Sequence, residues 1–198
     1  MRAFWVTILI LTMVSCLKEG CAQSTTVLKE FSFSSPALPG QTLHGLIYSP
    51  KTKEQKMPLL IYIHGNDSKG SNLDLVRKKG LPKVLAAGTP LPMMIIAPQL
   101  PIDQDWSPAF IDLFLNYINS RYSIDQDRIY LTGVSVGGAS AIDYTIANPD
   151  KIAAVICVSG WGNPHEVCKM KNVPAWFFHA IDDDRVSPVG SRVLTESL

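Results

Sequence analysis

The chain has 198 residues, of which 46% are hydrophobic, and its formal net charge at pH 7 is +1. This length and apolar content predict one domain with a substantial core and exclude an intrinsically disordered protein. The 18 basic and 17 acidic residues are scattered in mixed sign without a basic block. The sequence therefore predicts no nucleic-acid partner.

The first 22 residues are typical of an export signal. Arg2 gives a positive start, residues 3–17 are almost all apolar, and Gly20, Cys21 and Ala22 are small residues suited to a cleavage site. We therefore expect a signal peptide, residues 1–22, and a secreted or periplasmic mature chain, residues 23–198. The apolar run is too short to cross a bilayer comfortably, so no stable membrane span is expected in the mature chain.

The cysteines leave several alternatives open. Lipid attachment at Cys16 competes with cleavage, although Met13 fits a lipoprotein signal poorly, and an uncleaved anchor is a third alternative. In an oxidising compartment Cys157 and Cys168 could pair, but Cys157 lies in an apolar run where a free thiol also packs well. No Cys-His cluster has metal-ligand spacing and no glycine loop is suited to phosphate, so we expect no metal and no cofactor.

Apolar runs and turn formers predict alternating strands and helices along the mature chain. Strands are expected near residues 27–33, 43–49, 59–63, 93–97, 128–132, 152–158 and 175–179. Residues 72–87 are helix-like but interrupted at Gly80 to Pro82, so one broken helix or two short ones are expected there. Further helices are expected over residues 108–120 and 138–147, and residues 188–198 resemble a helix cut short. The first two strands predict an antiparallel edge pair, and the others predict a mostly parallel sheet with helices on both faces.

The sequence around Ser135 predicts a nucleophile. An apolar run ends at Thr132 and a helix begins within a few residues, so the chain must turn sharply with Ser135 at the apex. Gly133 and Gly137 are needed because a Cβ at either position would collide with the neighbouring strand or helix. The helix directs its free N–H groups at an oxyanion formed there, and the N–H of Val136 is the first candidate donor. An ordinary glycine-rich turn is the alternative.

Other candidate site residues also follow predicted strands, where reactive groups gather in parallel sheets. The N–H of Asn66 is the candidate for a second oxyanion donor, whereas the neighbouring His64 is expected to be structural. The carboxylate that orients a catalytic base is expected at residues 182–184, and a solvated acidic turn is the alternative. Trp106 and Trp161 could line a substrate pocket, although packing is the favoured interpretation for Trp106.

Taken together, these motifs resemble a known family. The matching stretches are His64-Gly65 with Gly70, Ala97-Pro98-Gln99 with Trp106, residues 127–138, and Phe178-His179 followed by Asp183 and Val186. Over residues 57–192 the chain resembles secreted serine esterases of the α/β-hydrolase superfamily, in particular the group of feruloyl esterases, polyhydroxybutyrate depolymerase-like proteins and predicted peptidases. The resemblance implies an α/β-hydrolase fold, Ser135 as nucleophile, Val136 and Asn66 as oxyanion donors, and Asp183 as the acid of the triad.

The chain departs from the family pattern in three places. Ala180 replaces the usual glycine, and Val136 replaces a common methionine or leucine. The family also carries its catalytic histidine some tens of residues beyond the aspartate, after one more helix and strand. None of the four histidines, His44, His64, His165 and His179, has that place in the sequence. We therefore expect a fragment of a longer coding sequence that lacks the last strand and helix, and poor solubility for residues 23–198 alone.

The leading interpretation is a secreted serine hydrolase that cleaves carboxylic esters through an acyl-enzyme on Ser135. Its partner would be a small-molecule or carbohydrate ester, with plant cell-wall esters as one class. A serine peptidase related to prolyl oligopeptidase, using the same serine and aspartate, is an alternative. A non-catalytic binding protein that keeps the hydrolase fold is another, favoured if the natural protein ends at Leu198.

Overall fold

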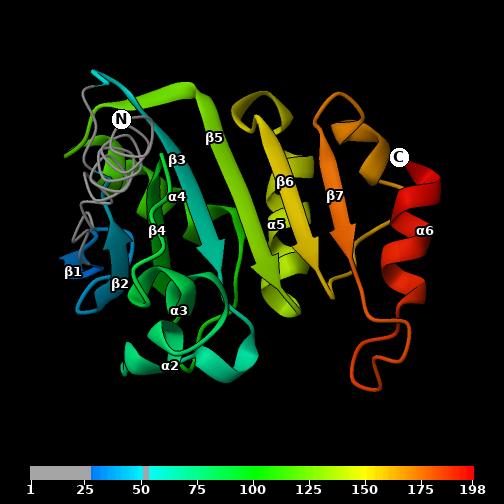
Figure 1. The fold of residues 1–198 in the computed structure, drawn as a ribbon, viewed down its shortest axis with the longest axis horizontal. Helices are drawn as coiled ribbons and strands as arrows, with labels where there is room; N and C mark the ends of the chain where they lie inside the picture. The colour runs from blue at the N-terminus through cyan, green and yellow to red at the C-terminus, as the bar shows by residue number, and fades with distance from the viewer. Residues whose placement is uncertain (1–27, 51–53) are drawn as a thin grey trace, which may run out of the picture.

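The computed structural model describes residues 28–50 and 54–198, so the predicted signal peptide and Cys16 lie outside the described residues. Within them, seven strands form one sheet in the order β1-β2-β4-β3-β5-β6-β7. The strands are β1 (Lys29–Ser34), β2 (Thr42–Tyr48), β3 (Met57–Ile63), β4 (Met94–Gln99), β5 (Ile124–Val134), β6 (Ala154–Val158) and β7 (Ala175–Phe178). Figure 1 shows them as a twisted sheet with β1 at one edge and β7 at the other.

The strand directions confirm the predicted arrangement. β1 pairs antiparallel with β2, and β2 pairs antiparallel with β4. From β4 onward all pairs are parallel, through β3, β5, β6 and β7. Five parallel strands therefore present their carboxyl ends at one edge of the sheet, where reactive groups gather in folds of this kind.

Helices cover both faces of the sheet, but unequally. They are α2 (Asp74–Arg77), α3 (Gly80–Ala86), α4 (Pro108–Asn119), α5 (Val136–Ala147) and α6 (Val189–Ser197), with short 3-10 turns η1 (Asn66–Ser68), η2 (Pro149–Lys151) and η3 (Val167–Met170). The main core lies between one face and α4, α5 and α6, with Phe114, Ile142 and Leu194 in its cluster. On the other face Val76 and Leu85, from α2 and α3, pack over β2, β4 and β3.

Alternation along the central strands explains how one sheet has two buried faces. In β3, Leu59, Ile61 and Ile63 join the main core, whereas Leu60 and Tyr62 point to the opposite face. Since period-2 alternation sends successive side chains to opposite faces, a nearly continuous apolar run is required here. Each such side chain stabilises the fold by about 1.5–3 kcal/mol relative to an exposed position.

The opposite face of β5, β6 and β7 is not covered by any helix of the described residues, as the front of Figure 1 shows. Ile156, Trp176 and Phe178 on this face are 37%, 64% and 43% exposed. These apolar side chains are exposed on a sheet face, and the poor solubility of residues 23–198 stays a prediction. Among the described residues, none of the helices has the length and apolarity needed to cross a bilayer.

The expected interruption within residues 72–87 is confirmed, because α2 and α3 are two short helices. Gly80 to Pro82 begin the second helix, where proline in a first turn loses no helical hydrogen bond. Gly80 adopts φ +48°, and a Cβ there would lie 2.1 Å from the hydroxyl of Tyr62. β5 begins at Ile124, ahead of the predicted strand, because Ile124 pairs with Met57. The next pairing joins Leu59 to Ile129, so the residues between Ile124 and Ile129 form a bulge.

The two cysteines of the described chain are both free. Cys157 is buried in β6 and Cys168 is exposed. Burial raises the pKa of the Cys157 thiol to about 11, so this thiol behaves as a small apolar group. The alternative of a free thiol in a buried strand is thus the one that the structure shows.

Candidate active site

Ser135 stands at a sharp turn between β5 and α5, as its sequence context predicts. Its φ of 57° and ψ of −126° lie in a region that residues with a side chain rarely adopt, at a cost of about 1–3 kcal/mol. The N–H of Ser135 donates to the carbonyl of Val158 at 2.9 Å, and its own carbonyl accepts from the N–H of Ala139 at 3.0 Å. The strained residue is therefore fixed from both sides.

The two glycines beside Ser135 are required by close backbone contacts. A Cβ at Gly133 would lie 2.2 Å from the carbonyl oxygen of Gly137, and one at Gly137 would lie 2.2 Å from that of Ile63. Both distances are far below van der Waals contact. The predicted collision with neighbouring backbone is confirmed at both positions.

Asn66 and Val136 lie where backbone donors are available. Val136 is the first residue of α5, and Asn66 is the first residue of η1, directly beyond β3. The first N–H groups of a helix have no partner within the helix. The loop of Asn66 is held by Gln99, whose side-chain amide donates to the carbonyls of Ser68 and Asn72, each at 2.9 Å.

His64 has the structural role expected of it. It is 1% exposed, its Nδ1–H donates to the carbonyl of Gly65 at 2.6 Å, and its Nε2 accepts from the N–H of Leu100 at 3.0 Å. Burial lowers the pKa of His64, which agrees with this neutral tautomer. His64 therefore connects the ends of β3 and β4.

Trp106 and Trp161 do not line the pocket that contains Ser135. The indole N–H of Trp106 donates to the carbonyl of His64 at 3.2 Å, and the ring packs edge-on against Phe110. Trp161 is 42% exposed. Neither tryptophan lines this pocket, and the packing alternative for Trp106 is the one observed.

Of the three consecutive aspartates, Asp183 is the one at the pocket. Its Oδ1 accepts from the N–H groups of Val186 at 2.9 Å and Arg185 at 3.0 Å. These two bonds, with smaller contributions from the Ser159 hydroxyl and His179, lower the pKa of Asp183. Its carboxylate is therefore ionised at neutral pH and suited to orient a cationic base.

Ser159 is a pocket residue that sequence reasoning missed. It follows β6, adopts a positive φ of 48°, and helps to lower the pKa of Asp183. The N–H of Ser159 donates to the carbonyl of Phe178 at 2.8 Å. The one signal available beforehand was its position directly after a predicted parallel strand.

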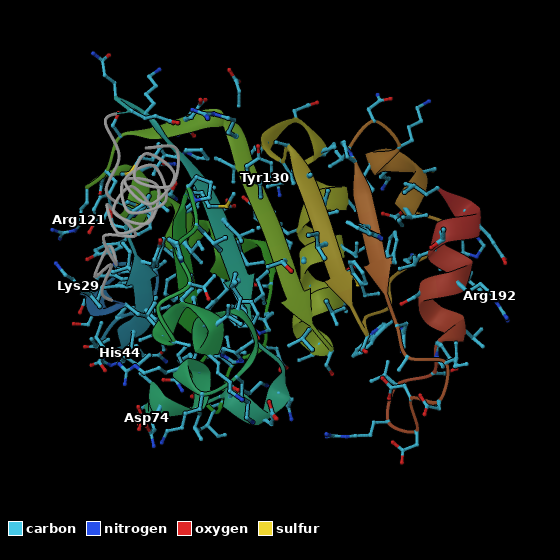
Figure 2. The ribbon with its side chains drawn as sticks, in the orientation of Figure 1. Lys29, His44, Asp74, Arg121, Tyr130 and Arg192 are labelled. Carbon is cyan, nitrogen blue, oxygen red and sulfur yellow. The ribbon has the colours of Figure 1, made fainter. Side chains whose placement is uncertain are left out.

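None of the four histidines, all of them in the described part of the chain, lines this pocket. His44 lies in β2, at the opposite side of the molecule from α6, where Figure 2 labels Arg192. His165 is exposed in the loop after β6. Within the described residues the Ser135 hydroxyl makes no hydrogen bond, so no base is in place beside it.

The pocket has a volume of about 820 Å³, within the usual range of small-molecule sites. Ser135, Asn66 and Asp183 all line it. Its apolar walls and charged rim are Leu60, Leu81, Val134, Ile156, Val158 and Val186, with Asp67, Lys79 and Arg185. At the rim Lys79 pairs with Asp67 at 2.6 Å. The arrangement provides a strained serine, backbone donors and an ionised carboxylate beside an apolar cavity.

A mostly parallel sheet with helices on both faces, and a strained serine between strand and helix at its carboxyl edge, defines the α/β-hydrolase fold. The family model described as "Putative esterase" matches residues 35–184. Since this is more than half of the chain, the protein belongs to that esterase family. A comparison with curated proteins finds no match.

Solved structures with the same fold include esterases and peptidases. A thermostable esterase superposes with a TM-score of 0.72 at 27% identity, over 86% of this chain and 51% of that one. The chain therefore spans about half the length of that esterase. The ferulic acid esterase AmCE1/Fae1A of the anaerobic fungus Anaeromyces mucronatus, in complex with ferulic acid, gives a TM-score of 0.67 at 16% identity, over 91% and 82%. The Pyrococcus horikoshii acylaminoacyl peptidase gives 0.61 at 16%, over 93% and 37%.

Proposed function

We propose that the protein is a secreted serine esterase that hydrolyses carboxylic esters through an acyl-enzyme on Ser135. The observation that carries this proposal is the strained serine, which shares one pocket with Asn66 and Asp183. Membership of the esterase family supports ester hydrolysis as the reaction. The roles of the individual residues and the export of the chain belong to the proposal.

In the proposed first step, the Ser135 hydroxyl oxygen attacks the ester carbonyl carbon while a general base takes its proton. The negative charge that develops on the carbonyl oxygen is stabilised by the N–H groups of Val136 and Asn66. Collapse of this tetrahedral intermediate breaks the bond to the alcohol oxygen, which leaves with a proton from the base. Water then attacks the acyl-enzyme in the same way and releases the acid.

Asp183 orients and stabilises the protonated base in this mechanism. Because the pocket contains no histidine, the proposal requires a base from elsewhere. That base would have to reach between Ser135 and Asp183.

The proposed substrates are small acyl esters, including esters of plant cell-wall carbohydrates. The apolar walls of the pocket fit an acyl or aromatic group. The fold is shared with the ferulic acid esterase AmCE1/Fae1A, in agreement with this class. Peptide hydrolysis is the second candidate, because an acylaminoacyl peptidase shares the fold.

The test is hydrolysis by the protein isolated from its native source. We expect turnover of 4-nitrophenyl acetate and methyl ferulate but not of a matched 4-nitroanilide. Ser135→Ala should lower kcat by at least about 10³-fold. Ser187→Ala, in the exposed loop before α6, should retain full activity. Preference for the anilide would favour the peptidase, and equal activity of Ser135→Ala and the wild type would exclude the proposed mechanism.

A further inference from the structure

His179 lies at the centre of a small polar network behind Asp183. It directly follows β7, and its side chain is 6% exposed. Its Nε2 lies 2.9 Å from the carbonyl oxygen of Val186 and 3.5 Å from Oδ2 of Asp183. Its Nδ1 lies 2.7 Å from the hydroxyl of Ser191, which in turn lies 2.9 Å from the carbonyl of Gly160.

The donors and acceptors determine where protons lie in this network. The Val186 carbonyl can only accept, so Nε2 of His179 carries a hydrogen. With a neutral imidazole, Nδ1 accepts the single hydroxyl proton of Ser191. With a doubly protonated ring, Nδ1–H donates to Ser191, whose own proton then reaches Gly160. His179 stays connected to α6 and to the Asp183 loop in both states.

The network has the composition of a catalytic triad but cannot act as one. Ser191 is 4% exposed, and it does not line the pocket. Its hydroxyl is occupied by His179 and Gly160, two partners from within the fold. No substrate carbonyl could reach Ser191 without unpacking α6. His179, Asp183 and Ser191 therefore form a support and not a second active site.

We propose that His179 is a positioning residue for Asp183, which deepens the proposed function and rests on it. Residues 180–186 form a loop whose tip is open to solvent, with Ile181 94% exposed. His179 connects the start of this loop to Val186 at its end and contacts Asp183 between them. The same ring attaches the loop to α6 through Ser191. His179 thus fixes the carboxylate at the position that the base requires.

Two amide variants separate the contacts of His179. His179→Gln keeps a donor close to the position of Nε2, toward Val186, and His179→Asn keeps one close to Nδ1, toward Ser191. We expect His179→Asn to lower kcat on 4-nitrophenyl acetate by about 10- to 100-fold with little change in KM, because a displaced carboxylate misorients the base. His179→Gln should recover most of this loss. His165→Gln, at an exposed position, is the control.

A second measurement does not depend on activity. Hydrogen exchange at the amides of Arg185 and Val186, which bind Asp183 Oδ1, should accelerate in His179→Asn and stay near wild type in His179→Gln. If His179→Asn does not fold, Ser191→Ala and His179→Gln, which both lose only the Nδ1 contact, should keep near wild-type exchange, and acceleration in either would overturn the inference. Wild-type kcat and exchange in His179→Asn would overturn the inference. Failure of the proposed function would give a different result, because Ser135→Ala would then be as active as the wild type, whatever the exchange rates of the His179 variants.

Discussion

The N–H of Ser135 donates to the carbonyl oxygen of Val158 at 2.9 Å, so the end of β6 holds the strained turn at the end of β5. This bond joins two neighbouring parallel strands at the point where the sheet ends. It offsets part of the cost of the positive φ at Ser135. Ser159, the residue directly after β6, helps to lower the pKa of Asp183. The end of β6 therefore holds Ser135 in place and lies in the same pocket as Asp183.

Replacing Gly137 with alanine should destabilise the protein strongly. Its Cβ would lie 2.2 Å from the carbonyl oxygen of Ile63 and 2.6 Å from that of His64, and backbone cannot retreat as a side chain can. We expect a loss of about 3 kcal/mol in the free energy of unfolding, measured with urea. Gly65→Ala is the control, because a Cβ there meets its nearest atom at 3.4 Å. Equal stability of the two variants would contradict the packing described.

Asp183→Asn should change how stability depends on pH. Because the folded pKa of Asp183 is lowered, the unfolded chain binds the proton more readily than the native state. Its stabilising contribution is complete above the ordinary value of 3.8 and is lost as the pH falls through the lower folded pKa. Urea unfolding should show a lower stability of Asp183→Asn at neutral pH and a flatter decline below pH 4. Asp182→Asn is the control, and parallel curves for Asp183→Asn and wild type would refute the expectation.

Trp106→Phe distinguishes a packing role of Trp106 from a role in substrate binding. Phenylalanine keeps an aromatic ring but leaves the buried carbonyl of His64 without its donor. We expect a loss of about 1–3 kcal/mol in stability and no change in KM. Trp161→Phe, at a position 42% exposed, should change stability by less than about 0.5 kcal/mol. A raised KM in Trp106→Phe at unchanged stability would return Trp106 to the substrate site.

The two thiols should react very differently with iodoacetamide. Cys168 is exposed, whereas Cys157 is buried and has a pKa raised to about 11. At a pH of about 8, mass spectrometry of the native protein should find Cys168 alkylated and Cys157 unmodified. Alkylation of both after unfolding is the control. A disulfide-linked peptide pair from the native protein would show that the two cysteines pair.

Trp176 should promote association of the described chain. It is 64% exposed beside Phe178, with ring centroids 4.6 Å apart, on the uncovered face of the sheet. We expect Trp176→Gln to lower light scattering and dye binding without loss of stability. Ile102→Gln, 75% exposed in the loop after β4, controls for the removal of any exposed apolar side chain. Unchanged scattering in Trp176→Gln would mean that this face does not cause association.

Local pattern was sufficient for the strands and for the turn at Ser135. Continuous apolar runs such as residues 59–63 are typical of strands buried on both faces, and glycines at positions 133 and 137 leave space that a sharp turn needs. The early start of β5 was not predictable, because its bulge depends on pairing with Met57 and Leu59. The close approach of the Tyr62 hydroxyl to Gly80 is likewise a contact that only the fold creates.

Some site residues were likewise predictable from the local sequence, and others were not. Ser135 carries a local signal in its flanking glycines, and residues 182–184 follow a strand, whereas the choice of Asp183 within that cluster came from the family resemblance. Ser159 and His179 each follow a predicted strand, but their partners are brought together by the fold, so the sequence did not reveal their contacts with the site. For Trp106 the packing role was the favoured interpretation, and its indole N–H has a partner in the core.

The most direct measurement is fluorophosphonate labelling of the protein from its native source, followed by digestion and mass spectrometry of the labelled residue and both termini. The proposed mechanism predicts a label on Ser135, because only an activated serine attacks the phosphorus. The same digest reads both termini of the natural protein. An ester-hydrolysing preparation in which Ser135 stays unlabelled, or another serine carries the label, would contradict the account.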